Sequence, residues 1–207
     1  MIMDPLHSPA SARAPIVVKL GGSLYHRIPG IIPILRAAGR PLLIVPGGGP
    51  FANAVREAQV DDDAAHWMAI AAMDQYGLHV ASHGLPVTET LAIPDHPVVL
   101  LPYRCLREKD PLPHSWYVTS DTIAAWIAYT LGLDLLLLKS VDGIMTGSAL
   151  LETVTSPLAT DVVDPAFLPF VLEKKIVTCI INGSDPDRIL QFLAGRQVPG
   201  TKTGTTF

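Results

Sequence analysis

The stretch Val17–Tyr25, "VVKLGGSLY", places one charged side chain in a segment that otherwise has the composition of a buried β-strand. The predicted strand covers Ile16–Leu20, and its one charged residue is Lys19, one of six lysines in the chain. Gly21–Ser23 follow at once and predict a turn at the carboxyl end of the strand. A buried unpaired charge is costly, so Lys19 needs an anionic partner.

The composition bounds the class of protein. The chain has 207 residues, which fits one domain or one domain with a small lobe. Hydrophobic residues make up 49% of it and charged residues only 16%, so a large core is expected. The net charge of −4 argues against a protein that binds nucleic acid through a basic surface.

The N-terminus and the cysteines indicate the compartment. The first 14 residues lack the apolar core of a signal peptide, and no segment reaches the roughly 20 apolar residues of a membrane-spanning helix. Cys105 and Cys179 are expected to be reduced thiols, because two cysteines make no disulfide framework. We therefore predict a cytoplasmic protein with a disordered N-terminus over residues 1–14 and no membrane partner.

Apolar strands alternate with helical segments on both sides of the opening stretch. Strands are predicted at residues 16–20, 41–46, 96–103, 133–140 and 175–183, and helices at 31–38, from 51, and at 62–82, 119–132, 163–173 and 185–195. This alternation is typical of an α/β fold with an open, mostly parallel sheet covered by helices on both faces, a three-layer αβα sandwich. The pattern does not determine the strand order.

Two glycine clusters each follow a buried strand, so both should lie at the same edge of a parallel sheet, where such folds bind ligands. Glycine lets backbone N–H groups approach phosphate oxygens, and the helix expected after the second cluster directs its positive end to the same place. The predicted phosphate-binding residues are Gly21, Gly22, Ser23, Gly47, Gly48 and Gly49. The alternative is a pair of tight turns, and neither cluster has P-loop or Rossmann spacing.

Four segments, in this order and spacing, resemble the amino acid kinase superfamily: "VVKLGGSL", "LLIVPGGGPFANAVR", "SWYVTSDTIAAWIA" and "LLLLKSVDGI". The superfamily includes acetylglutamate, aspartate, uridylate and isopentenyl phosphate kinases. Four further segments resemble one branch of it, the kinases of methanofuran biosynthesis: "HWMAIAAMDQYG", "PLPHSWYVTSD", "VDPAFLPFVL" and "IINGSDPDRILQFLAG". The resemblance extends from about residue 17 to the C-terminus.

The resemblance implies a carbamate kinase-like fold over residues 15–207, with an acceptor-binding lobe to about residue 133 and a nucleotide-binding lobe beyond it. It also implies phosphorylation of [5-(aminomethyl)furan-3-yl]methyl phosphate to the diphosphate, with ATP and Mg²⁺, by a homo-oligomer. Because no dense carboxylate cluster lies near the glycines, we expect Mg²⁺ to arrive with ATP rather than at a metal site of the protein.

The resemblance assigns catalytic roles to Lys19, which binds the phosphoryl group in transfer, and to Asp121, which organises the catalytic lysines. The alternative for Asp121 is a helix N-terminal residue, with Thr119 or Ser120 as the cap. The family's second lysine is matched only by Lys174 or Lys175, and either of these fits a solvated surface lysine equally well.

The predicted nucleotide-binding residues are Lys139, Ser140, Asp142, Gly143 and Lys175. The "VDG" turn corresponds to the ATP ribose and adenine edge in the family, and its alternative is an ordinary type I turn. Lys139 and Ser140 depart from the family pattern, which has Thr-Asp or Thr-Lys here. Lys139 either contacts ATP phosphates or caps the strand.

The predicted acceptor-binding residues are Asp74, His114, Ser115 and Ser120. Asp74 is a carboxylate on an otherwise apolar helix, where the aminomethyl group of the substrate would be its partner. His114 and Ser115 precede "WYVTSD" and are within reach of the acceptor phosphate. His66 on the same helix as Asp74 reads as a core histidine.

Two other functions stay open at this point. One is a kinase for another small acid or phosphate, such as an amino acid, UMP or isopentenyl phosphate. The other is a non-catalytic storage or binding protein like the molybdenum storage subunits, which share the superfamily fold.

Overall fold

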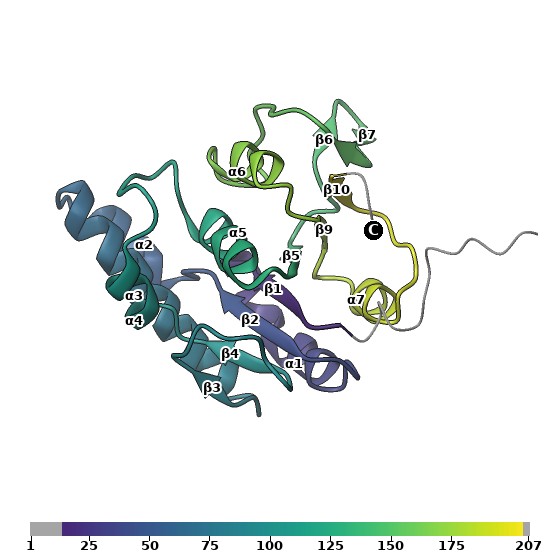
Figure 1. The fold of residues 1–207 in the computed structure, drawn as a ribbon, viewed down its shortest axis with the longest axis horizontal. Helices are drawn as coiled ribbons and strands as arrows, with labels where there is room; N and C mark the ends of the chain where they lie inside the picture. The colour runs from purple at the N-terminus through teal and green to yellow at the C-terminus, as the bar shows by residue number, and fades with distance from the viewer. Residues whose placement is uncertain (1–13, 205–207) are drawn as a thin grey trace, which may run out of the picture.

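The computed structural model describes residues 14–204, so the predicted disordered segment lies almost wholly outside the described residues. An eight-stranded sheet with the order β3-β4-β2-β1-β5-β9-β10-β8 forms the centre of the molecule (Figure 1). Its strands are β1 Ile16–Leu20, β2 Leu42–Pro46, β3 Val87–Thr88, β4 Val98–Leu100, β5 Asp134–Lys139, β8 Thr153–Val154, β9 Thr178–Asn182 and β10 Thr201–Thr203. Among the strand pairs of this eight-stranded sheet, only β9–β10 is antiparallel, so the prediction of a mostly parallel sheet is confirmed.

Helices cover both faces of this sheet. They are the 3₁₀ helix η2 Gly22–Arg27 and the α-helices α1 Ile28–Arg36, α2 Phe51–Glu57, α3 Asp62–Ala81, α4 Tyr103–Lys109, α5 Ser120–Leu131, α6 Phe167–Glu173 and α7 Pro186–Leu193. Side chains of α1 and α7 pack on one face, and those of α4, α5 and α6 pack on the other, while α3 contributes to both cores. The predicted three-layer αβα sandwich is therefore confirmed.

The alternation of side chains along β1 explains the two cores. Val18 and Leu20 face the α1 side, whereas Val17 faces the α5 side, as expected for a strand with period-two geometry. All five residues of β1 are buried, because the strand is central and pairs with β2 on one side and β5 on the other. A charged side chain on β1 therefore has no route to solvent across the sheet.

The elements that the sequence did not predict are short or irregular. Strands β3 and β8 have two residues each, and the hairpin of β6 Met145–Thr146 and β7 Ala149–Leu150 stands apart from the main sheet. Segments of this length carry no measurable periodicity. Helix α1 begins at Ile28, three residues before the predicted start, because Pro29 occupies its first turn, a position that suits proline.

Within residues 14–204, no helix combines the length and the apolar content that a membrane crossing requires. Cys105 and Cys179 are both buried free thiols, which confirms that they form no disulfide.

Helix α3 supports the start of α4 through a carboxylate. Asp74 Oδ1 accepts a hydrogen bond of 3.0 Å from the backbone N–H of Tyr103, the first residue of α4. Burial raises the pKa of Asp74 to about 6, and the Tyr103 hydrogen bond offsets this only in part. Asp74 is thus a partly buried structural carboxylate between two helices.

We predict that Asp74→Asn stabilises the protein at neutral pH. A carboxyl whose folded pKa lies above its unfolded value of about 4 costs stability as pH rises from about 4 to about 6. Asn keeps the acceptor for Tyr103 but carries no charge. The free energy of unfolding should rise by ~1 kcal/mol at pH 7.5 and change little at pH 4, measured by urea denaturation.

The exposed variant Asp95→Asn serves as the control for this measurement and should show no such pH dependence. A gap between Asp74→Asn and the wild type that is larger at pH 4 than at pH 7.5 would contradict the assignment.

Candidate active site

The two glycine clusters touch one another at the carboxyl edge of the sheet. The N–H of Gly47 donates to Leu20 O at 2.9 Å, and the N–H of Gly21 donates to Leu138 O at 3.0 Å. A Cβ on Gly22 would lie 2.7 Å from Gly49 N, so only glycine permits this approach. The amides of Gly21 and Gly47 thus bond to neighbouring strands, whereas Gly22, Gly48 and Gly49 are partly exposed where the loops meet.

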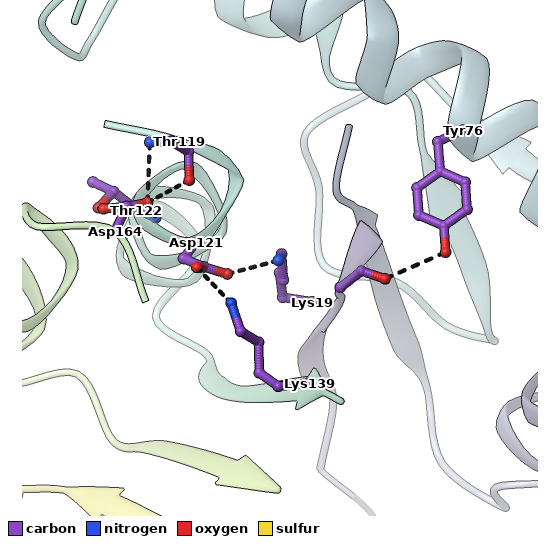
Figure 2. A network of polar contacts seen from close by, with 8 residues as sticks. Lys19, Tyr76, Thr119, Asp121, Thr122, Lys139 and Asp164 are labelled. Atoms are coloured by element: carbon purple, nitrogen blue, oxygen red, sulfur yellow. Dashed lines mark hydrogen bonds and ion pairs between the residues drawn. The ribbon is translucent and has the colours of Figure 1, made fainter. Parts of the chain in front are cut away.

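The ring of Tyr76 supports both loops from α3. Its hydroxyl donates to Gly21 O at 3.3 Å (Figure 2), and a Cβ on Gly49 would lie 3.2 Å from its ring. Gly49 also has φ of +54°, a conformation that favours glycine. Side chains at these positions would separate the loops.

Lys19 and Lys139 hold the same carboxylate between them (Figure 2). Lys19 Nζ lies 2.6 Å from Asp121 Oδ1, and Lys139 Nζ lies 2.8 Å from Asp121 Oδ2. Lys19 is 3% exposed and Asp121 4% exposed. The partner that Lys19 requires is therefore Asp121, and the three side chains form a buried cluster with one positive charge in excess.

Three elements supply this cluster. Lys19 is the fourth residue of β1, Lys139 ends the neighbouring strand β5, and Asp121 lies in the first turn of α5. Burial alone would raise the pKa of Asp121, but the two ammonium groups outweigh burial and lower it. Burial lowers the pKa of Lys19, and the attraction of Asp121 offsets this only in part. Asp121 is accordingly ionised over the whole working pH range.

A second carboxylate, which the sequence did not single out, positions Asp121. Asp164 Oδ2 accepts hydrogen bonds from Thr119 N at 3.0 Å, Thr119 Oγ1 at 2.9 Å and Thr122 N at 3.0 Å, and Asp164 Oδ1 accepts one from Thr122 Oγ1 (Figure 2). Asp164 therefore caps α5. The sequence predicted Thr119 or Ser120 as the cap; Thr119 is the N-cap residue, but its side chain makes no capping bond.

The sequence around Asp164 does not indicate that this residue caps α5. The residue lies 42 positions beyond Thr122 and directly before Pro165, so it reads as the start of the next helix. No local pattern relates it to α5. Only the packing of the loop before α6 against α5 brings it there.

A cavity of about 480 Å³ opens beside the glycine loops. Its walls come from η2, the second glycine loop, α2, α3 and the segment 115–123, and they include the aromatic residues Tyr25 and Trp116. Among its lining residues, Asp62 is the single carboxylate and Arg56 the single guanidinium. Arg56 lies over the Trp116 ring, 5.1 Å from its centroid. The cavity thus offers charges of both signs and flat rings.

The structure brings most predicted phosphate- and acceptor-binding residues to this cavity. Those that line it are Gly22, Ser23, Gly48, Gly49, Ser115 and Ser120. Gly21 and Gly47 belong to the same loops but lie outside the lining. His114 stacks against His66 behind the wall, with ring centroids 4.0 Å apart. Asp74 does not line the cavity, because its carboxylate faces the start of α4 instead.

The predicted nucleotide-binding residues separate into two groups. Lys139, Ser140, Asp142 and Gly143 follow one another at the carboxyl end of β5. Asp142 Oδ1 accepts from Asn182 Nδ2 at 2.9 Å and from an Arg188 guanidinium N–H at 2.7 Å, which lowers the pKa of Asp142.

Lys175 is the exception. It is exposed in the turn before β9, and since β9 runs parallel to β5, this turn lies at the opposite edge of the sheet from Lys139. The same holds for Lys174, which pairs with Glu173. Neither lysine is close to Asp121; the second lysine of the cluster is Lys139.

Comparison with solved structures defines the class of this fold. A uridylate kinase from Archaeoglobus fulgidus superimposes with a TM-score of 0.70 at 19% identity, covering 91% of this chain and 99% of that one. A UMP kinase from Ureaplasma parvum gives 0.70 at 18% identity, with 93% and 99% covered. An isopentenyl phosphate kinase gives 0.63 at 17% identity, with 91% and 99% covered. The chain has the amino acid kinase fold.

Comparison of sequences narrows the class. The chain is 29% identical over 210 residues to the [5-(aminomethyl)furan-3-yl]methyl phosphate kinase of Methanocaldococcus jannaschii, an alignment that covers 90% of this chain and 96% of that kinase. No family model matches the sequence. The resemblance inferred from the motifs is confirmed, because the relative in sequence and the neighbours in structure are kinases.

We predict that Asp121→Asn destabilises the protein by about 3–5 kcal/mol, because it leaves two buried ammonium groups facing one another without a counter-charge. Adding Lys139→Met to this variant should recover part of the loss, since one uncompensated charge is removed. Chemical denaturation of the two single variants and the double variant gives the coupling energy. Strictly additive effects would show that the carboxylate and Lys139 do not interact.

Proposed function

We propose that the protein transfers the γ-phosphoryl group of ATP to the phosphate of a small amine-bearing acceptor, and that this acceptor is [5-(aminomethyl)furan-3-yl]methyl phosphate. The observation that carries the proposal is the cavity beside the glycine loops. It combines backbone N–H groups for a phosphate with one carboxylate, Asp62, for a cation. The resemblance to the Methanocaldococcus jannaschii kinase supports the same acceptor.

The reaction makes one bond and breaks one. An oxygen of the acceptor phosphate attacks the γ-phosphorus of ATP, and the bond from that phosphorus to the β–γ bridging oxygen breaks, leaving ADP. The second pKa of a phosphate monoester is about 6, so the attacking oxygen is largely ionised at pH 7 and needs no general base. Catalysis then rests on positioning and on stabilising charge.

Lys19 and Lys139 supply that charge stabilisation. Negative charge spreads over the equatorial oxygens of the transferred group, and fixed positive groups in a low-dielectric site stabilise it strongly. The shared contact with Asp121 holds both lysine side chains in place before substrate arrives. The amides of Gly22 and Gly48 would bind the phosphates on the other side. This assigns Lys139 as the second phosphoryl-binding lysine, the role for which the sequence offered Lys174 or Lys175.

The contacts of the site's carboxylates indicate whether one of them is available to bind Mg²⁺. Kinases use Mg²⁺ to neutralise nucleotide phosphates. Asp121 already holds two lysines, and Asp142 holds Arg188 and Asn182, so neither is an open ligand for a resident ion. We therefore infer that Mg²⁺ enters with ATP and that Ser140, Asp142 and Gly143 contribute to the nucleotide side.

Charge complementarity favours an amine-bearing acceptor over UMP or isopentenyl phosphate. Asp62 begins α3 at the cavity wall, and Arg56 stands on α2 nearby. An acceptor with an ammonium and a phosphate at opposite ends of a flat ring meets both charges. Asp62 is exposed, so an acceptor without a cation would leave this carboxylate to solvent and gain no contact from it.

The assembly and the location of the kinase remain predictions. Met68 and Leu78 on α3 are exposed apolar side chains, 40% and 54% accessible, in keeping with a homo-oligomer packed through this helix. Cytoplasmic location follows only from the sequence argument.

The function is tested by incubating the purified protein with Mg-ATP and a panel of acceptors: the aminomethylfuran phosphate, UMP, isopentenyl phosphate and an amino acid. Phosphorus NMR should show a diphosphate product with the first acceptor alone. Lys19→Ala should lower the rate by about 10²–10³ or more, which controls for contaminating kinases, and Lys109→Ala on the surface of α4 should not change it. Faster conversion of another acceptor would replace the proposed substrate.

Asp62 is predicted to recognise the amine. Asp62→Asn keeps the volume and removes the charge. The ratio of wild-type to variant kcat/KM for the aminomethyl substrate should therefore correspond to a loss of about 1.5–3 kcal/mol in transition-state stabilisation, the range for a hydrogen bond to a charged group. An analogue with a methyl in place of the aminomethyl group should be affected much less. The matched control is Glu57→Gln at the end of α2, outside the cavity lining. Equal losses on both acceptors would assign Asp62 a structural role.

A further inference from the structure

Three side chains of metal-ligand type meet behind the wall of the acceptor cavity. They are His66 on α3, Asp110 just after α4, and His114 in the segment that leads to α5. One ligand atom from each lies within 4.8 Å of the other two. None of the three belongs to the phosphoryl-transfer cluster around Asp121.

The contacts of His114 have the form of an oriented metal ligand. Its Nε2 lies 2.9 Å from Asp110 Oδ1, and its Nδ1 lies 2.7 Å from Asp63 Oδ1. Histidine ligands in metal sites commonly donate one ring N–H to an outer carboxylate, which sets the tautomer and aims the other nitrogen at the ion. Asp63 is placed to be that outer carboxylate.

His66 supplies the second nitrogen. Its ring stacks on His114 with an interplanar angle of 21°, and within residues 14–204 no hydrogen bond engages a ring nitrogen of His66. Burial lowers the pKa of His66, and the neighbouring His114 lowers it further. His66 is therefore neutral at pH 7 and carries an available lone pair beside the His114–Asp110 pair.

We propose that His66, Asp110 and His114 bind a divalent transition-metal ion of the zinc type, with water at the fourth position. Two imidazole nitrogens and one carboxylate oxygen are a donor set of tetrahedral zinc sites, whereas Mg²⁺ prefers six oxygens. Zinc–nitrogen bonds of about 2.0–2.1 Å lie in the plane of each ring, so the stacked rings of His66 and His114 must turn toward one ion while the exposed Asp110 closes on it. This site lies beyond the proposed kinase reaction.

His114 contacts Asp63 and Asp110, and its ring stacks on His66. Histidine and carboxylate groups bind a metal ion in their deprotonated forms, so metal affinity should fall as pH falls.

The bound ion would tie the segment 110–114 to α3. The next residues of that segment, Ser115 and Trp116, line the acceptor cavity, as does His66 itself. The ion would thus hold two walls of the cavity at a fixed spacing.

The test is a titration of the chelator-treated full-length protein with ZnCl₂, measured by isothermal calorimetry. The buffer contains no phosphate, ATP or acceptor. We expect one equivalent to bind at pH 7.5 and weaker binding at pH 5.5. Co²⁺ should give the visible absorbance of a tetrahedral site. Asp63→Asn should weaken binding by about 10–100-fold.

Asp110→Asn and His66→Gln should each abolish most of the zinc binding. Asn suits position 110, whose φ of +42° lies in the left-handed region that Asn tolerates, so the fold should persist. The control is Asp95→Asn, which alters another exposed carboxylate–histidine pair, Asp95 with His96, and should leave the titration unchanged. Absence of stoichiometric binding, or wild-type binding by Asp110→Asn and His66→Gln, would overturn the proposal. Because no kinase substrate is present, either result is independent of the proposed reaction.

Discussion

The arrangement of the site depends on a single buried carboxylate, Asp121, which pairs with both lysines. It lies between the buried ammonium group of Lys19 and the partly exposed ammonium group of Lys139. Alone, each of the three charges would be expensive to bury. Together they leave one positive charge that is already desolvated and already oriented. A site that must stabilise negative charge on a phosphoryl group needs such a preorganised excess.

The sheet order is what makes this arrangement possible. β1 and β5 are neighbours in space although more than one hundred residues separate them in the chain, so Lys19 and Lys139 emerge from adjacent strands. Helix α5 then begins directly above them. Asp164 fixes that beginning by accepting hydrogen bonds from Thr119 and Thr122. It is a positioning residue, because it touches neither lysine and holds the start of α5, which carries Asp121.

The cavity beside the glycine loops is formed by different interactions from the cluster of Lys19, Asp121 and Lys139. Its glycine loops come into contact because Gly22 and Gly49 have no side chains, and Tyr76 supports them from below. Its far wall is built by α3, which carries Asp62 and His66 on the cavity side. The same helix turns Asp74 away, toward the start of α4. Chemistry and recognition are therefore carried by separate elements that meet at one sheet edge.

The amino-acid sequence by itself determined the local chemistry of this protein. Period-two apolar strands, helix caps and glycine-rich turns act over a few residues, so the αβα class, the buried strand of Lys19 and the two glycine loops could be predicted from it. The strand order, the pairing of Lys139 with Asp121, the cap from Asp164 and the choice of Asp62 rather than Asp74 as the cavity carboxylate were decided only by the tertiary structure. Each of these depends on which residues distant in the chain are brought together, and on which way a helix rotates as it buries its apolar surface. Helix α3 is apolar around most of its circumference, so its sequence contains no preferred face, and packing against the sheet alone settles which of its carboxylates lines the cavity.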